Sequence, residues 1–565
     1  MLAGSTPWPP ELAARYRAEG WWEGRTIAAL LAERAARHPA RVALIDGERR
    51  IPYADLVRRA DRLAARLRRL GLAPTDRVVM QLPNTAEFVV AYLALTRLGA
   101  IPVMALRAHR ESEIAHFVGH AGAVACMVPG VLQGFDHRRM AQDVAARCPT
   151  LRQVFVLGEP LRGQLALQPL IDEPMDEAAV AAALQDLQPD PSEVATMLLS
   201  GGTTSMSKLI PRTHDDYLLN ARVCGEVAGF DDTTVWLAVL PLGHNYNLAS
   251  PGLLGTFHYG GTVVIAPAMD ADTVFGLVER HRVSVISAAV PLIAAWLAAD
   301  PAARHDLSSL RVIQNGGARL APELRRRVRE QLRCTPQEVY GTAEGLINMT
   351  RLDDPDDLLL QTSGAPVCSA DEIKVVDDEG HEVPDGTPGE LLTRGPYTIR
   401  GYFDAPDKNR EAFTADGFYR MGDVVRRQGR HVSTEGRKND LINRGGEKIG
   451  CEEVENLIFR HPAVHQVALV AMPDEVFGEK ACAFVVPKPG ATLGFEELVA
   501  FLRQQRIASF KLPERLELVP SLPTSLVGKV LKRQLRERIA AMLAAERNAA
   551  RQPARDTPDG TAPAA

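Results

Sequence analysis

The sequence is poor in cysteine and has no strong excess of charge of either sign, and both absences narrow the possible functions. Seven cysteines are scattered along 565 residues without a Cys-x-x-Cys pair. Neither a disulfide framework nor a zinc site is therefore predicted, and a reducing, cytoplasmic setting is expected. The net charge is −5, which gives no electrostatic reason to expect binding to nucleic acid or to an anionic membrane.

A long hydrophobic segment is also missing. The longest run without charged residues or histidine, residues 283–299, contains two serines and a proline. It is predicted to divide into a strand at 283–286 and a helix with Pro291 in its first turn, which excludes a membrane span. The first residues include three prolines and an acidic side chain, so no signal peptide is expected.

Short apolar runs alternate with amphipathic helix patterns over much of the chain. Helices are predicted at 85–98 and 111–121, and the arginines at 58–69 are predicted to form the solvated face of another helix. Strands are predicted at 77–82, 101–105, 123–128, 235–240, 261–265 and 310–314. Strands separated by helices of this length are typical of parallel sheets covered on both faces, so the expected fold class is α/β.

Two changes of pattern predict the domain organisation. Residues 370–435 carry short strands with Asp-Gly turns, which favours a small antiparallel subdomain. After a Gly- and Arg-containing break, residues 450–540 have the pattern of a compact α+β module. The predicted parts are a large N-terminal domain at 1–438, a small mobile C-terminal domain at 439–545 and a disordered tail at 546–565.

A loop of small residues that ends on a lysine is the strongest local signal. It spans 200–208, follows an apolar strand predicted at 195–199, and precedes a Thr213-x-x-Asp216 helix start. Glycines allow close backbone approach, turned N–H groups and hydroxyls can hold phosphate oxygens, and the lysine adds a positive charge. The loop lacks the Gly-Lys-Ser/Thr ending of a Walker A motif, and a surface turn is the alternative interpretation.

Four further segments carry groups suited to nucleotide chemistry, although each alone could be an ordinary turn, linker or surface lysine. Residues 340–344 combine an aromatic ring, a small hydroxyl and a carboxylate, which could hold a purine, a phosphate and Mg²⁺. Residues 419–423 end on a carboxylate, after a tight turn, that is suited to two ribose hydroxyls. Residues 436–446 supply a cation and a glycine pair at a domain border, and 523–530 present a lysine beside a glycine.

Together and in this order, the five segments resemble the adenylate-forming superfamily, which includes acyl-CoA synthetases, peptide-synthetase adenylation domains and firefly-type luciferases. The resemblance extends from about residue 27 to 543. Longer strings are similar to the stand-alone aryl-acid–AMP ligases, which supply 2,3-dihydroxybenzoate or salicylate to siderophore assembly. These strings include 208–217, 244–246, 343–348, 392–402 and 442–448.

The resemblance implies ATP and Mg²⁺ as cofactors. Ser200, Gly201, Gly202, Thr203, Thr204 and Lys208 would surround the triphosphate. Gly316, Gly317, Ala318, Tyr340 and Gly341 would line the adenine site, Asp423 and Arg437 the ribose. Glu344 would bind Mg²⁺, Thr342 would contact the α-phosphate, and Lys529 would reach the reacting carboxylate and the α-phosphate.

The resemblance also implies an aryl pocket. Its walls would be His244, which is also expected among the catalytic residues, with Asn245, Tyr246, Ser250, Ala318 and Ile347. Asn245 would donate to the carboxylate and the ortho hydroxyl of the acid. Salicylate-preferring members tend to carry cysteine at the position of Ser250, so its hydroxyl favours 2,3-dihydroxybenzoate. Asn247 stands where the aryl ligases carry proline.

The implied reaction has two halves. The acid and ATP give the aryl-AMP and pyrophosphate, and the aryl group then passes to the phosphopantetheine thiol of a separate aryl carrier protein. Between them the C-terminal domain would turn about a hinge at Asn439 and open a channel past Gly445 and Gly446. The alternatives are an aryl-CoA ligase, a luciferase-like oxygenase and a non-catalytic ligand sensor. Nucleic acid and membranes are not expected as partners.

Overall fold

The computed structural model describes residues 1–200, 207–444, 447–474, 476–505, 507, 509–525 and 530–551. Within these ranges the side chains of 437, 439, 443, 447, 448 and 548–551 are not described. The chain divides into two compact units, the first comprising Met1–Thr434 and the second Glu435–Ser525 together with the last helix. The predicted border at 438/439 falls in the short helical turn η2 (Lys438–Asp440).

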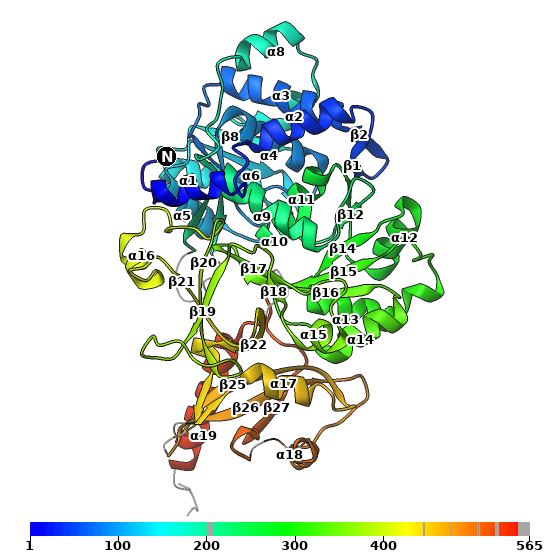
Figure 1. Ribbon diagram of the computed structural model, residues 1–565, viewed down its shortest axis with the longest axis vertical. Helices are drawn as coiled ribbons and strands as arrows, with labels where there is room; N and C mark the ends of the chain where they lie inside the picture. Colours follow the sequence, from blue (N-terminus) through cyan, green and yellow to red (C-terminus); the bar gives the residue numbers. More distant parts are fainter. Residues whose placement is uncertain are drawn as a thin grey trace, which may run out of the picture. The chain divides into compact units, whose positions relative to one another are not determined.

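Two large sheets form the body of the first unit (Figure 1). The nine-stranded sheet has the order β18-β17-β16-β15-β14-β12-β13-β1-β2. Its strands are β1 (Val42–Asp46), β2 (Arg49–Pro52), β12 (Val235–Ala238), β13 (Thr262–Ile265), β14 (Val285–Ala288), β15 (Val312–Gly316), β16 (Thr335–Thr342), β17 (Gly345–Met349) and β18 (Ala365–Pro366). The six strands from β1 to β16 along this order pair in parallel, as the alternating pattern predicted.

The seven-stranded sheet has the order β11-β10-β4-β3-β5-β8-β9. Its strands are β3 (Arg77–Met80), β4 (Ile101–Met104), β5 (Ala125–Pro129), β8 (Gln153–Leu157), β9 (Leu165–Ala166), β10 (Val194–Leu199) and β11 (Leu209–Thr213), and a separate hairpin joins β6 (Val131–Leu132) to β7 (Phe135–Asp136). All pairs are parallel except β10 with β11, which form an antiparallel hairpin. The predicted phosphate loop is the connection of this hairpin.

Helices separate most of the parallel strands. Those of the first unit are α1 (Pro10–Ala18), α2 (Ile27–Arg37), α3 (Tyr53–Arg69), α4 (Ala86–Leu98), α5 (Glu111–Ala121), α6 (His137–Arg147), α7 (Leu167–Asp172), α8 (Glu177–Leu184), α9 (His214–Val227), α10 (Asn245–Ala249), α11 (Gly252–Tyr259), α12 (Ala271–His281), α13 (Val290–Ala299), α14 (Pro322–Gln331), α15 (Asp356–Gln361) and α16 (Pro406–Ala412). The uncharged run at 283–299 becomes β14 and α13, with Pro291 in the first turn. Among the described residues, no helix combines the length and the apolar character needed to cross a bilayer.

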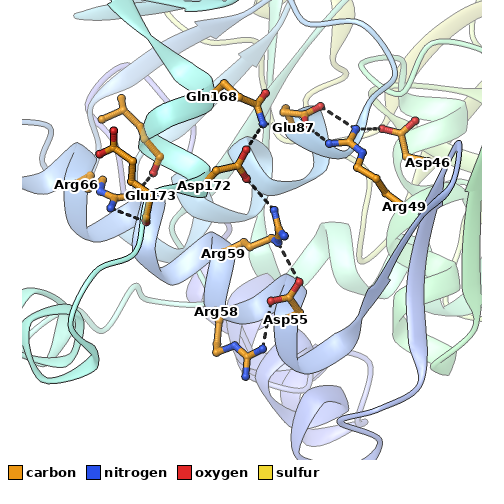
Figure 2. A network of polar contacts seen from close by, with 11 residues as sticks. Asp46, Arg49, Asp55, Arg58, Arg59, Arg66, Glu87, Gln168, Asp172 and Glu173 are labelled. Carbon is orange, nitrogen blue, oxygen red and sulfur yellow. Dashed lines mark hydrogen bonds and ion pairs between the residues drawn. The ribbon is translucent and has the colours of Figure 1, made fainter.

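Two arginines of α3 form hydrogen bonds with α7 and the residue that follows it. The helix packs against α4, α7 and α8. Figure 2 shows Arg59 between Asp55 on its own helix and Asp172 at the end of α7. Arg66 donates to the carbonyl oxygens of Leu170 and Glu173, which close the C-terminal end of α7. The predicted solvated face is therefore partly an interface, because guanidinium groups can reach backbone carbonyls that a helix end leaves unpaired.

The antiparallel subdomain predicted at 370–435 is present as a four-stranded sheet, β19-β20-β21-β22. Its strands are β19 (Glu372–Val376), β20 (Pro388–Arg394), β21 (Tyr419–Gln428) and β22 (His431–Arg437), and β22 runs across the point where the two units divide.

The second unit is a small α+β module, as the sequence predicted. It contains β23 (Ile442–Arg444), β24 (Glu447–Ile449), α17 (Cys451–Ile458), β25 (Val464–Asp474), β26 (Gly478–Pro487), α18 (Phe495–Gln504), β27 (Arg515–Leu518) and α19 (Lys532–Arg551). The last helix continues through 546–551, which were predicted to belong to a disordered tail. Residues 552–565 lie outside the described part of the chain.

Candidate active site

Two reciprocal hydrogen bonds between Ser200 and Lys208 close the base of the predicted phosphate loop. Ser200 N–H donates to the carbonyl of Lys208 (3.0 Å), and Lys208 N–H donates to Ser200 Oγ (2.9 Å). The Ser200 hydroxyl oxygen thus accepts a hydrogen bond at the base of the loop. Gly201, Gly202, Thr203 and Thr204 lie outside the described residues, so their contacts with phosphate remain predictions. The helix start expected after the loop is confirmed, because Thr213 and Asp216 form a capping box at the start of α9.

A buried arginine that the sequence analysis missed connects this hairpin to the predicted Mg²⁺ residue. Arg212, on β11, is fully buried and pairs with Asp216 at 2.7 Å. Its other nitrogens donate to the carbonyls of Ala343 (2.9 Å) and Tyr397 (3.1 Å). Since Ala343 precedes Glu344, Arg212 fixes the backbone of the turn that carries the predicted metal ligand.

Glu344 lies in the tight connection between β16 and β17. Its Oε1 accepts a hydrogen bond from the hydroxyl of Tyr402 at 2.8 Å, and the residue is 7% exposed. Thr342 Oγ1 donates to the carbonyl of Gly345 at 2.9 Å, which closes the turn. Gly345 has φ +127°, and a Cβ there would lie 2.4 Å from Thr398 Cα, so only glycine fits.

The residues predicted to bind adenine and ribose meet directly. Tyr340, near the end of β16, donates its hydroxyl hydrogen to Asp423 Oδ2 at 2.8 Å. Asp423 is 7% exposed. It was expected just after a tight turn, but it lies inside β21, and the turn at Gly417 comes earlier in the chain. Gly422, just before the carboxylate, has a positive φ (+71°), and the pairing of β20 with β21 shifts register at this point.

Four of the residues predicted to line the aryl-acid pocket lie in the short helix α10 or at its two ends. His244 is its N-cap, and His244 Nδ1 accepts the backbone N–H of Tyr246 at 3.3 Å. Burial lowers the pKa of His244 to about 4, so the ring is neutral at neutral pH. Because Nδ1 accepts, the proton is on Nε2, and that nitrogen can donate to an anionic substrate.

Asn245 is held by its carbonyl oxygen. Tyr217, on α9, donates its hydroxyl hydrogen to Asn245 Oδ1 at 3.0 Å, and Asn245 Nδ2 lies 3.4 Å from Ser250 Oγ. Asn220, also on α9, donates to the same hydroxyl oxygen at 3.2 Å. Two amide groups therefore take the lone pairs of Ser250, which leaves its O–H as a donor. Asn247 donates from its amide nitrogen to the carbonyl of Leu240 at 2.7 Å.

A second wall comes from the strands of the nine-stranded sheet. Gly316 ends β15, and a Cβ there would lie 2.7 Å from the Tyr246 ring, so the glycine is needed for that ring to approach. The carbonyl of Ala318 accepts from Asn315 at 2.7 Å, and Gly317 has φ +88°. Ile347 on β17 is buried, and its N–H donates to the hydroxyl of Tyr397 at 3.2 Å. Gly341 faces Ile347 in the same hairpin.

Several predicted residues cannot be placed. Lys529, Gly445 and Gly446 lie outside the described residues, and the side chains of Arg437 and Asn439 are not described. Their assignments rest on the sequence alone.

The described site residues suit a magnesium ion that is bound mainly by the phosphates of the nucleotide. Among them, no cluster of three or more His, Cys, Asp or Glu side chains could hold a metal. A single carboxylate with one oxygen committed to Tyr402 matches the way Mg²⁺ usually binds, through one or two carboxylates and the phosphates of a nucleotide.

Comparison with known proteins shows the family of this chain. The model of the AMP-binding enzyme family matches residues 31–403, and that of the AMP-binding enzyme C-terminal domain matches 453–529. A 2,3-dihydroxybenzoate-AMP ligase of Bacillus subtilis (strain 168) is 48% identical over 96% of this chain and 99% of its own length. A 2-hydroxy-7-methoxy-5-methyl-1-naphthoate–CoA ligase of Streptomyces carzinostaticus is 47% identical over 94% of this chain and 97% of its own.

A solved structure is similar to this chain over most of its length. The apo structure of MbtA from Mycobacterium smegmatis superimposes with a TM-score of 0.73 and 41% identity, and covers 95% of this chain and 99% of that one. The match to the AMP-binding enzyme family includes the β10–β11 hairpin and strand β16, which carries Tyr340. The chain belongs to the AMP-binding enzymes and is an ATP-dependent, adenylate-forming ligase.

Proposed function

We propose that this protein activates an aromatic 2-hydroxy carboxylic acid with MgATP and then passes the aryl group to the phosphopantetheine thiol of a separate aryl carrier protein. The observation that carries the proposal is the polar wall of Asn245, Ser250 and Asn220. All three are at least nine-tenths buried, and buried polar groups of this kind call for polar partners on the substrate. A long aliphatic chain has none to offer.

The hydrogen bonds within this wall define what it can recognise. Asn245 Oδ1 accepts from Tyr217 and one N–H of the amide donates to Ser250, so the amide has its other N–H for the substrate. That group suits a carboxylate oxygen and an adjacent phenol oxygen, which lie close enough on one ring to share an amide donor. Asn220 Oδ1 is buried and has no hydrogen-bond partner among the described residues. A ring hydroxyl near Ser250 could accept from Ser250 and donate to Asn220.

The first half-reaction needs positioning and charge neutralisation more than covalent help. A carboxylate oxygen attacks the α-phosphorus of ATP in line, a P–O bond forms, and the bond to pyrophosphate breaks. Lys208, Lys529 and the Mg²⁺ on Glu344 would balance the charge on the phosphates. The neutral His244 would donate from Nε2 to the acid without adding a charge to the pocket.

In the second half-reaction a thiolate attacks the acyl carbon, a C–S bond forms, and AMP leaves with the electron pair of the acyl–oxygen bond. The acceptor is proposed to be a carrier protein, while CoA is the second candidate, because one of the relatives is named as a CoA ligase. The two acceptors are distinguished by supplying each one to the preformed aryl-AMP and measuring thioester formation. A faster rate with CoA would overturn the carrier-protein proposal and leave adenylation unaffected.

The substrate itself is proposed to be 2,3-dihydroxybenzoate ahead of salicylate. The 3-hydroxyl would meet Ser250, and leaving a buried polar group unpaired costs roughly 1–3 kcal/mol, about tenfold to a hundredfold in preference. The test compares kcat/KM for the two acids in the wild type and in Ser250→Cys. The variant is expected to shift preference toward salicylate. A wild type that already prefers salicylate, or an acid without the ortho hydroxyl, would contradict the proposed pocket.

A further inference from the structure

Tyr402 touches both charged groups on which the triphosphate is expected to depend. It follows β20, and the residue is 2% exposed. Its hydroxyl donates to Glu344 Oε1 at 2.8 Å, and the Tyr419 hydroxyl lies 3.2 Å away. On the face of the same ring, the ammonium nitrogen of Lys208 lies 4.4 Å from the ring centroid. A single side chain thus connects the end of the phosphate loop with the predicted metal ligand.

The backbone of Tyr402 is anchored on two sides. Its N–H donates to Asn409 Oδ1 at 2.7 Å, and Asn409 Nδ2 donates back to its carbonyl at 3.0 Å. The next residue, Phe403, donates its N–H to the carbonyl of Leu209 at 2.9 Å, one residue beyond Lys208. His120 also lies 3.1 Å from the Phe403 carbonyl. The backbone that carries the ring is therefore held by residues that are not among the predicted site residues.

These contacts fix the orientation of the Glu344 carboxylate and the position of the Lys208 ammonium group. Because one oxygen of Glu344 accepts from the phenol, the carboxylate is fixed in rotation and has its second oxygen for a cation. Mg²⁺ requires a narrow coordination geometry, so a fixed carboxylate favours its binding. The aromatic face attracts the Lys208 ammonium without neutralising it, and a Glu344–Lys208 ion pair would occupy both groups instead.

We propose that Tyr402 is a positioning residue that orients Glu344 toward Mg²⁺ through its hydroxyl and holds Lys208 for the triphosphate through its ring. The inference rests on the proposed function, since it assumes that MgATP binds at Glu344 and Lys208. The hydroxyl and the ring have separable roles, and two substitutions separate them. Tyr402→Phe removes only the hydroxyl, and Tyr402→Leu also removes the aromatic face.

The control is a buried tyrosine outside the site. Tyr53, at the start of α3, is fully buried and donates its hydroxyl hydrogen to the carbonyl of Gly261 at 2.7 Å. Tyr53→Phe therefore removes one buried hydroxyl of the same kind. Thermal unfolding of all three variants gives the loss of stability, and only effects beyond those of Tyr53→Phe are attributed to positioning.

Metal binding is read directly, without turnover, from Mn²⁺ paramagnetic resonance in the presence of a non-hydrolysable ATP analogue. Tyr402→Phe is expected to raise the Mn²⁺ dissociation constant roughly 10-fold or more, the usual effect of removing an outer-shell partner, with unchanged metal-free binding of the analogue. Tyr402→Leu is expected to weaken metal-free binding as well, roughly 2- to 10-fold.

Three results would each contradict one part of the proposal for Tyr402. Equal Mn²⁺ affinity in Tyr402→Phe and in the wild type would contradict the role of the hydroxyl. Equal metal-free binding in Tyr402→Leu and Tyr402→Phe would contradict the role of the ring. A wild type that binds no analogue at all would instead refute the nucleotide site on which both roles depend.

Discussion

Tyr217 and Asn245 are 28 positions apart in the chain and meet through one hydrogen bond of 3.0 Å. Removing the hydroxyl in Tyr217→Phe frees the Asn245 amide to rotate. Since a hydrogen bond of this kind contributes about 0.5–1.5 kcal/mol, the KM for the acid is expected to rise by roughly 2- to 10-fold. The KM for ATP is expected to stay unchanged. Steady-state kinetics with each substrate varied in turn measure both constants.

The matched control is Tyr259→Phe, which removes a hydroxyl that donates to the carbonyl of Arg222. If both variants raise the KM for the acid equally, or if Tyr217→Phe leaves it unaltered, Asn245 does not depend on Tyr217 for its orientation.

Asp371 is a buried carboxyl that is linked to the predicted pocket residue Ile347 through Tyr397. It accepts the hydroxyl hydrogen of Tyr397 at 2.6 Å, and Tyr397 in turn accepts the N–H of Ile347. Burial raises the pKa of Asp371 to about 7, above its value in the unfolded chain. The folded state therefore holds the proton more tightly, and stability is lost as the pH rises toward and through 7.

Asp371→Asn removes this titration and retains an acceptor for Tyr397. Between pH 5 and pH 8 the wild type is expected to lose roughly 2–3 kcal/mol of stability relative to the variant. Urea unfolding at the two pH values measures the difference. Parallel stability profiles in the two proteins would show that Asp371 titrates in the folded state as it does in the unfolded chain.

The packing of α3 on α7 depends on Arg66, which donates to carbonyl oxygens at the end of α7. Arg66→Met keeps much of the apolar stem and leaves those carbonyls without the guanidinium. A loss of roughly 1–3 kcal/mol in the free energy of unfolding is expected. Arg62→Met on the same helix is the control, because Arg62 forms no hydrogen bond or ion pair with the described residues. Equal losses in the two variants would contradict the interface role.

Much of the architecture could be predicted because local signals agree with the fold. Helix α4 begins after Thr85, which accepts the N–H of Phe88 as its N-cap, and the predicted strands at 77–82 and 101–105 flank it as β3 and β4. Strand β11 was not predicted. Pro211 and Arg212 resemble loop residues, yet both are buried, because Arg212 finds Asp216 and two carbonyls in the interior.

The site could be predicted only where its residues stand in contiguous motifs. Tyr340 and Asp423 were found this way, and the structure brings them into contact. The contact of Tyr402 with Glu344 joins positions 58 apart, and that of Asn220 with Ser250 joins positions 30 apart. No spacing rule connects such pairs, since strand order and helix packing create them.

Lys529 is predicted to act in only one of the two half-reactions. Lys529 lies outside the described residues, and its placement at the reacting carboxylate remains a prediction. Lys529→Ala is expected to slow adenylation on the order of 10²-fold or more, because a charge-stabilising group is lost from the transition state. Thioester formation from a supplied aryl-AMP is expected to be largely intact. Equal damage to both half-reactions would contradict a lysine that serves adenylation alone.

Acid-dependent exchange of labelled pyrophosphate into ATP examines the first half-reaction without any acceptor thiol. The purified protein is assayed with Mg²⁺ and ATP alone, and then with 2,3-dihydroxybenzoate, salicylate, benzoate or a fatty acid. Exchange is expected only with an added acid, and most strongly with the two ortho-hydroxy acids, because Asn245 and Ser250 then find partners. Exchange that is absent with every aryl acid, or strongest with benzoate or a fatty acid, would contradict the proposed activity.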